Sequence, residues 1–349
     1  MYILGQRQTG KKASGLERDL REWNIPEEVM SVLLKDRTTG NNLIWATDDY
    51  APRGDGFSFH DEILLEQIVS RDDPVIRPRV DKSQQEQKSR IVKNAEVFTP
   101  AWICNKQNNL VDAAWFGWTK PDSSPFNEEC KASSLPRPWK RSSDPIQFPV
   151  GRTWRDYVKA CRLEVSCGEA PYLTSRYDAS TGHMIPVADR IGLLDRKLRV
   201  ITENLGTSDP QEWFYYAKRA VQSCYGFDWQ GDNVLLAREN VLAAVVEAFN
   251  ADFHGEESSY PGWSRKPILE LAEVVSWNIW QMDGIKFVVP KSCERVEEKD
   301  IFGNVAVKRC PGCTRKDSRR HVGRYCMVMD WSSDLEPRPI RFVDMMGGA

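Results

Sequence analysis

Three carboxylates lie within or next to short apolar stretches that are typical of buried β-strands. Glu164 lies within residues 162–165, Asp228 ends residues 224–228, and Asp283 follows residues 279–282. Acids at the carboxyl ends of strands in an open α/β sheet face the ligand crevice, where they accept hydrogen bonds from ribose hydroxyls and base amino groups. The pattern therefore predicts a nucleoside-binding site. For Asp228, a solvated turn residue is an equal alternative.

A turn of small residues follows the first of these stretches and contains Cys167 and Gly168. Because glycine has no side chain, the backbone at this turn can come close to a bound ligand. The shape suits a nucleoside cofactor without phosphates, such as S-adenosylmethionine. It predicts that Glu164, Cys167 and Gly168 contact that cofactor, although a strand followed by a glycine turn occurs in many α/β proteins.

A second kind of chemistry is indicated near the end of the chain. Cys310 and Cys313 form a C-x2-C pair, a spacing that supplies two thiolates to one tetrahedral zinc ion. Cys293, His321 and Cys326 are available to complete the site, and we take Cys293 and Cys326 as the other two ligands. Reduced thiols without a metal, or a redox pair, are the alternatives.

The same region is rich in cations. Asp317 is the only acid between residues 309 and 324. This segment is the best candidate in the chain for contacts to DNA phosphates, with a solvated basic loop as the alternative. The predicted nucleic-acid-binding residues are Arg309, Arg315, Lys316, Arg319, Arg320 and Arg324.

Helices must alternate with these strands to position the acids at one edge. Thr99 before Pro100 predicts the start of a helix, and Asp209 before Pro210 predicts another. A further helix begins near Asp232, after the strand that ends in Asp228. The alternation predicts an α/β fold with helices on both faces of the sheet.

Composition narrows the class of protein. The 349 residues carry 48 basic and 50 acidic side chains, so any nucleic-acid binding must come from local patches rather than a global positive charge. No apolar run approaches the roughly 20 residues that span a bilayer. The nine cysteines are scattered in a chain without an export signal. We therefore expect a cytoplasmic protein with no membrane partner.

Four stretches, in order, resemble the motifs of adenine-specific DNA methyltransferases of restriction–modification systems, above all the type I modification subunits. They are residues 96–100, 163–173, 225–240 and 278–283, and the whole chain also resembles the group called restriction endonuclease subunit M. The resemblance implies a Rossmann-like class I methyltransferase fold with S-adenosylmethionine as cofactor. The positions matching the cofactor contacts are Phe98, Thr99, Glu164, Cys167, Gly168, Asp228 and Asp283.

The chain departs from this family at several positions. Val165 stands where the family has proline, Ala170 stands where it has the second glycine, and residues 173–225 form a longer connection than the usual single helix. The Asn- or Asp-Pro-Pro-aromatic tetrapeptide that holds the flipped adenine has no counterpart, because the chain contains no Pro-Pro pair. Asp330 and Trp331, after an apolar stretch in the expected place, are the predicted catalytic residues.

The expected organisation has three parts: an N-terminal helical and irregular segment (1–90), a methyltransferase-like domain (91–292), and a small basic, cysteine-containing extension that completes the sheet (293–349). The expected function is methyl transfer from S-adenosylmethionine to adenine N6 in DNA, together with a specificity or endonuclease subunit. The alternative is a catalytically degenerate subunit that binds DNA or a partner protein.

Overall fold

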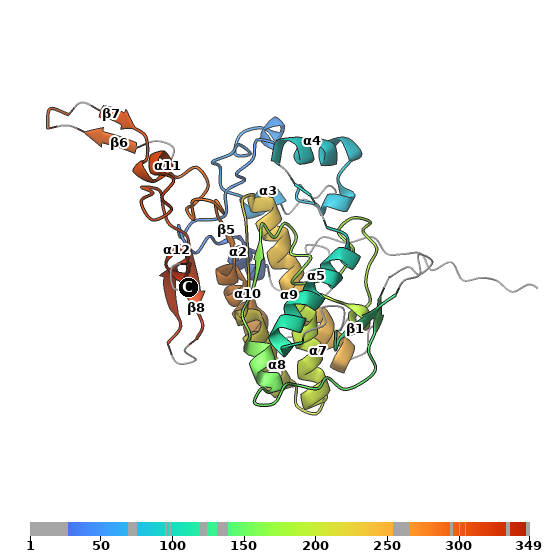
Figure 1. Ribbon diagram of the computed structural model, residues 1–349. Helices are drawn as coiled ribbons and strands as arrows, with labels where there is room; N and C mark the ends of the chain where they lie inside the picture. Colours follow the sequence, from blue (N-terminus) through green and yellow to red (C-terminus); the bar gives the residue numbers. More distant parts are fainter. Residues whose placement is uncertain are drawn as a thin grey trace, which may run out of the picture.

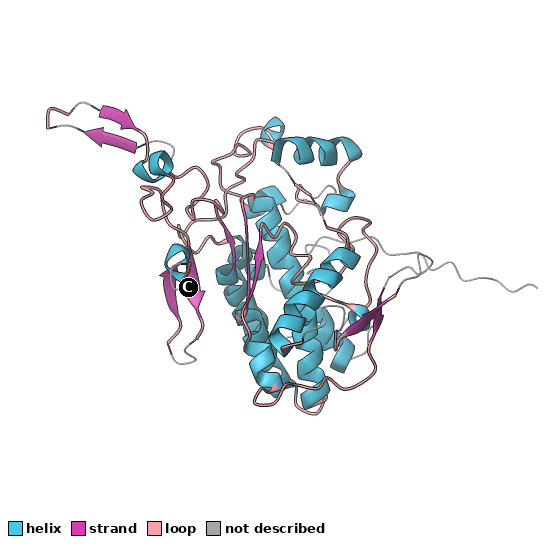
Figure 2. Ribbon diagram, in the orientation of Figure 1, coloured by secondary structure: helices cyan, strands magenta, loops and turns pink. Residues whose placement is uncertain are grey.

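The computed structural model describes residues 27–68, 75–94, 96–97, 99–118, 124–130, 139–253, 265–293, 296–299, 301–303, 305–332 and 336–346. The fold is mixed α/β: helices surround a small parallel sheet, and three antiparallel hairpins lie outside it (Figures 1 and 2). The described helices include none that is long and apolar enough to cross a membrane. All nine cysteines lie in described residues and are free thiols.

The parallel sheet contains β3 (Arg162–Val165), β4 (Cys224–Asp228) and β5 (Ile279–Gln281) in the order β3-β4-β5. Glu164 lies opposite Gly226, and Asp228 lies opposite Gln281. The strands run in the same direction, so their carboxyl ends share one edge. Within the described residues the parallel sheet has these three strands and no others.

Pairs of helices connect the parallel strands, as parallel pairing requires a crossover. α7 (Leu193–Leu205) and α8 (Pro210–Gln222) join β3 to β4, which accounts for the long connection noted in the sequence. α9 (Gly231–Phe253) and α10 (Arg265–Asn278) join β4 to β5. The predicted start of α8 is confirmed: the Asp209 carboxylate accepts from the backbone N–H groups of Gln211 and Glu212.

The N-terminal segment packs onto this core rather than standing apart. It contains α2 (Glu28–Leu34), η1 (Ala51–Arg53), α3 (Leu65–Ile68), η2 (Arg79–Asp81) and α4 (Gln84–Asn94). The guanidinium of Arg238, fully buried in α9, donates to the carbonyls of Leu33 and Lys35 from this segment and of Ser276 and Ile279 from the core. The expected boundary after residue 90 falls inside α4.

α5 (Ala101–Phe116) begins one residue later than predicted, and its capping group is not Thr99. The backbone N–H of Ala101 donates instead to Asp178 Oδ2 at 2.9 Å. A cap from a residue so distant in sequence leaves no local signal. The chain then continues through β1 (Asn127–Glu129), β2 (Trp139–Arg141) and α6 (Trp154–Lys159) to β3, and η3 (Val187–Asp189) precedes α7.

The C-terminal extension forms separate small elements. It contains the hairpin of β6 (Val296–Lys299) and β7 (Val305–Lys308), α11 (Pro311–Arg315), β8 (Met327–Asp330), β9 (Arg338–Arg341) and α12 (Phe342–Met345). β8 pairs antiparallel with β9 and with no strand of the parallel sheet. The expectation that this extension completes the parallel sheet is therefore wrong for the described strands.

Candidate functional site

A cavity of about 880 Å³ opens at the carboxyl ends of β3 and β4. This volume lies in the range of cavities that hold small molecules and cofactors. Five of the predicted cofactor-binding residues line its wall together: Thr99, Glu164, Cys167, Gly168 and Asp228. Phe98, also predicted to contact the cofactor, lies outside the described residues.

The floor of the cavity is the loop after β3. Ser166, Gly168 and Ala170 all adopt left-handed backbone conformations, with φ of 51°, 52° and 61°. Such φ values favour glycine, so Ala170 holds a glycine-like conformation. The left-handed residues alternate along the loop, and Ser166, Cys167 and Gly168 line the cavity.

Asp228 fixes this loop to β4. Its Oδ2 accepts from the backbone N–H of Gly168 at 3.0 Å, while its Oδ1 accepts from the N–H of Gln230 at 3.0 Å and from Asn233 Nδ2 at 3.4 Å. Burial raises the pKa of this carboxyl, against the lowering by these hydrogen bonds. Asp228 is therefore an ordered acceptor in the wall, and the alternative of a solvated turn residue is wrong.

Asn233, next to Asp228 in the wall, offers an unused acceptor. Its Oδ1 is buried and receives no hydrogen bond from the described residues. A buried acceptor without a donor costs about 1–3 kcal/mol, and an amino or hydroxyl group of a ligand would satisfy it. Together with Asp228, this acceptor suits a ligand that carries hydroxyl or amino donors.

Glu164 acts differently from the prediction. Its two oxygens accept from the backbone N–H groups of Tyr172 (3.2 Å) and Leu173 (3.0 Å), so it orders the chain beyond the loop while lining the cavity. Burial raises the pKa of Glu164 to about 8, opposed by these two hydrogen bonds and assisted by the negative charge of Asp228.

Asp283 is not in the cavity wall. β5 ends at Gln281, and the Asp283 carboxylate accepts from the backbone N–H groups of Ile285 and Lys286, both at 3.0 Å. Its Oδ2 also lies 3.3 Å from Lys286 Nζ. The prediction that Asp283 contacts the cofactor is wrong for this structure, because the following tight turn uses the carboxylate.

The predicted catalytic residues also lie elsewhere. Neither Asp330 nor Trp331 lines the cavity. Asp330, at the end of β8, accepts from the backbone N–H of Ser332 at 2.9 Å, and the indole N–H of Trp331 donates to Asn278 Oδ1 at 2.7 Å. Trp331 packs against the main core, while Val328 of β8 packs with Phe227 of β4 and Trp280 of β5.

The N-terminal segment supplies a wall that sequence reasoning missed. Asp48, Asp49 and Phe59 line the cavity opposite the loop, and Lys291 lies beside them. The ammonium of Lys291 stands 3.9 Å from the centre of the Phe59 ring. The sequence stretch at Asp48 and Asp49 is typical of an ordinary turn, so only the tertiary fold reveals their place.

A buried ionic network holds the N-terminal segment, which carries Asp48, Asp49 and Phe59, against α9. Asp232, at the start of α9, is fully buried and accepts from the Tyr50 hydroxyl at 2.7 Å. Its Oδ2 lies 2.8 Å from Arg90 and 3.4 Å from Lys82. Burial opposes ionisation, but the two cations hold the pKa of Asp232 down at about 2. The network ties α4 and the N-terminal segment to α9.

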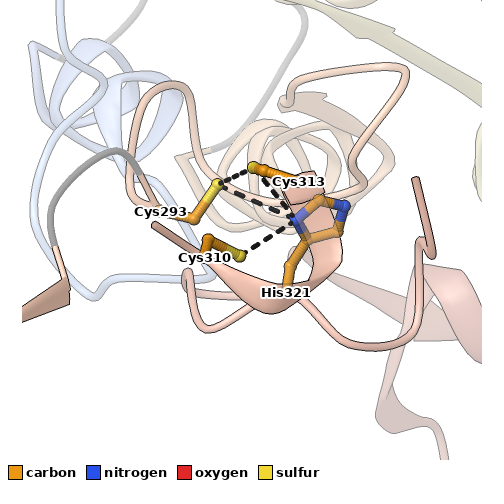
Figure 3. A group of neighbouring side chains, drawn as sticks. All are labelled: Cys293, Cys310, Cys313 and His321. Carbon is orange, nitrogen blue, oxygen red and sulfur yellow. Dashed lines mark hydrogen bonds between the residues drawn. The ribbon is translucent and has the colours of Figure 1, made fainter. Parts of the chain in front are cut away.

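Three cysteines and one histidine form a candidate metal-binding cluster in the C-terminal extension (Figure 3). Sγ of Cys293 lies 3.4 Å from Sγ of Cys313, and Nδ1 of His321 lies 3.5–3.9 Å from the three sulfur atoms. A tetrahedral zinc with ordinary Zn–S and Zn–N bonds separates its ligand atoms by roughly 3.5–3.8 Å. The four side chains are therefore spaced for one such ion.

Cys326 is not in the cluster, and that predicted metal ligand is wrong. It is buried among apolar side chains beside Val328 and Phe342, and its thiol contacts the carbonyl of Gln281 at 3.3 Å. His321 takes the fourth position instead, since the loop after α11 brings it back to Cys310. Sequence spacing alone could not choose between these two residues.

The backbone around Cys310 is shaped for a thiolate. Burial alone would raise the pKa of the Cys310 thiol. Hydrogen bonds from backbone N–H groups, including that of Val322 at 3.4 Å, outweigh this effect and lower the pKa to about 6. A side chain at Gly312 would place its Cβ only 2.6 Å from the backbone nitrogen of His321. Glycine is therefore required for the C-x2-C turn to approach the histidine loop.

The predicted DNA-contacting cations surround this cluster. Arg320 lies 3.1 Å from Asp317, its neighbour in the loop. All six side chains are exposed: Arg309, Arg315, Lys316, Arg319, Arg320 and Arg324.

Comparison with known proteins adds no relative. No family model, no curated protein and no solved structure matches the chain.

Proposed function

We propose that this chain binds S-adenosylmethionine in the cavity at the ends of β3 and β4 and takes part in the methylation of adenine N6 in DNA. The observation that carries the proposal is the convergence of Gly168, Asp228 and Asn233 on one cavity. Their backbone and side-chain acceptors suit a ribose and a base, and the cavity has the size for such a ligand.

In this proposal the chain's own residues bind and orient the cofactor. The left-handed loop around Gly168 allows close backbone approach, Asp228 accepts from ribose hydroxyls, and the free Oδ1 of Asn233 accepts from a further donor. The bound cofactor supplies an activated methyl group. Catalysis then depends on holding that methyl in line with the adenine nitrogen, which is a matter of position and electrostatics.

A second candidate function is a degenerate subunit that binds cofactor or DNA without transferring the methyl group. One observation favours it: Asp330 and Trp331, the chain's substitutes for the adenine-holding tetrapeptide, lie away from the cavity. An active enzyme would then need the adenine-holding groups from a specificity or endonuclease partner.

We also propose that the cluster of Cys293, Cys310, Cys313 and His321 holds a structural zinc ion. Four protein ligands leave no open coordination position, as in structural rather than catalytic zinc sites. The ion would join the segments that carry Cys293, the C-x2-C pair and His321.

Methyl transfer is tested directly with purified protein, unmethylated DNA and S-adenosylmethionine carrying a labelled methyl group. Labelled N6-methyladenine, formed by the chain alone or with co-purified partners, supports the enzyme proposal. Cofactor binding without label in DNA under either condition supports the degenerate subunit.

A further inference from the structure

The hairpin β6–β7 lies between two members of the metal cluster. β6 begins at Val296, shortly after Cys293, and β7 ends at Lys308, shortly before Cys310. The ligand atoms of the cluster lie within 4.8 Å of one another. An ion bound there would close the loop at its base and fix the direction in which the hairpin extends.

The tip of this hairpin is apolar and exposed. Ile301 and Phe302 are 92% and 82% exposed, and the hairpin extends away from the helical body (Figure 1). Single exposed apolar residues are common on protein surfaces. Two adjacent large ones at the end of a projecting arm form a point of contact, because burying them removes apolar surface from water.

The root of the hairpin carries positive charge. Six exposed cations lie in residues 309–324 against the single acid Asp317. Clustered arginine and lysine suit the phosphate backbone of a nucleic acid, whose binding releases counterions. Residues 294–308 themselves carry four acids and three bases, so the charge that favours a polyanion as partner lies at the root of the hairpin.

We propose that the β6–β7 hairpin is a DNA-binding arm whose Ile301–Phe302 tip inserts between base steps while the arginines at its root hold the phosphates. β6, Val296–Lys299, spans roughly 10 Å, more than the depth of either groove of B-DNA, about 8 Å. Inserted apolar side chains unstack and kink a duplex, and the extra phosphate contacts compensate for that cost.

This inference rests on the proposed function in taking DNA as the macromolecular substrate. It goes further in naming the groups that contact DNA and the distortion that they cause. The inserted side chains come from a part of the chain outside the cofactor cavity, so the arm and the cavity can be tested separately.

The test uses the full-length protein and a short mixed-sequence duplex containing 2-aminopurine, whose fluorescence rises when its base unstacks. Wild type is compared with the double variant Ile301→Ser, Phe302→Ser and with the matched surface variant Val150→Ser, which changes an equally exposed apolar residue. Binding is followed by anisotropy over a range of salt concentrations, and metal content is measured in each protein.

We expect wild type and Val150→Ser to bind with a fluorescence rise, and the tip variant to lose that rise and bind about tenfold more weakly. A second variant, Arg319→Ala with Arg320→Ala, should reduce the salt slope by about two. A tip variant that keeps wild-type affinity and fluorescence would overturn the proposal, as would wild-type protein that does not bind the duplex.

Titration of the same proteins with S-adenosylmethionine separates the two proposals. If the protein binds the cofactor and the tip variant binds DNA as wild type does, the proposed function is supported and the DNA-binding arm is contradicted. If wild-type protein does not bind the cofactor but the tip variant loses DNA binding, the DNA-binding arm is supported and the proposed function is contradicted.

Discussion

The backbone N–H of Gly168 donates to Asp228 Oδ2 at 3.0 Å, and this bond joins the loop after β3 to the end of β4. The acid that the sequence suggests for ribose binding thus also holds the glycine loop in place. One side chain orders the loop and keeps acceptor capacity at the cavity, so changes at Asp228 should affect loop order and ligand binding together.

Trp331→Phe should destabilise the protein without changing cofactor binding. The indole N–H donates to Asn278 Oδ1 at 2.7 Å, and Asn278 is fully buried. Loss of the indole N–H leaves the Asn278 acceptor unsatisfied, at a cost of about 1–2 kcal/mol. Chemical denaturation should show this loss, while equilibrium dialysis should show unchanged affinity for S-adenosylmethionine. Unchanged stability with loss of methyl transfer to DNA would instead favour the catalytic role predicted from the sequence.

Glu164→Gln should change how stability depends on pH. The folded protein holds the pKa of Glu164 at about 8, above the ordinary value of 4.5. Between these values the unfolded chain has already released the proton that the folded protein keeps, so wild-type stability falls as pH rises through this window. The amide cannot ionise and should remove that contribution.

The measurement is the free energy of unfolding by denaturant across this pH window. The difference between Glu164→Gln and wild type should grow in favour of the variant as pH rises, by a few kcal/mol at most. Asp156→Asn, at an exposed helix N-terminus, is the control and should not shift with pH in this window. If the free energies of unfolding of Glu164→Gln and wild type changed in parallel with pH, the raised pKa of Glu164 would be contradicted.

Asp232→Asn should be strongly destabilising at neutral pH. It leaves the buried cations of Arg90 and Lys82 without their shared carboxylate, and removing one partner of a buried ion pair costs about 3–5 kcal/mol. The folded pKa of Asp232 is lowered to about 2, so its contribution is present above pH ~4 and is lost as pH falls towards 2.

Tyr50→Phe is the graded comparison for this network, since it removes only the hydroxyl that donates to Asp232. We expect about 1 kcal/mol for that variant. Thermal unfolding at neutral pH should rank wild type, Tyr50→Phe and Asp232→Asn in descending stability. Equal stability of the two variants would mean that the ionic network contributes little.

Metal analysis distinguishes the two possible fourth ligands. We expect one zinc per chain in wild type and in Cys326→Ala, and less than half of that in Cys310→Ser and in His321→Asn, since a four-ligand site loses affinity with each ligand removed. Retention of zinc by His321→Asn with its loss from Cys326→Ala would restore the ligand set predicted from the sequence.

The sequence located the local features of the site and missed its long-range ones. Strand β3 with its glycine turn, strand β4 ending in Asp228, and the capped start of α8 all depend on neighbouring residues and were predictable. Phe59 and Lys291 meet in the wall of the cavity although most of the chain separates them. No local pattern encodes that contact.

The errors share a physical cause. Asp283 and Trp331 follow strands and Asp330 ends one, but local turns use the Asp283 and Asp330 carboxylates, and β8 pairs with β9 instead of the parallel sheet. Cys326 and His321 are both suitable zinc ligands, and only the packing of Cys326 into an apolar cluster excludes it. The spacing of residues in the sequence fits more than one ligand set, and only tertiary packing decides between them.

Calorimetric titration of the full-length protein with S-adenosylmethionine, alongside Asp228→Ala, tests the central claim most directly. The account predicts one site per chain with micromolar affinity, weakened at least about tenfold in the variant. Asp330→Ala, outside the cavity, should bind as wild type does. No heat of binding at millimolar cofactor, or equal binding by wild type and Asp228→Ala, would contradict it.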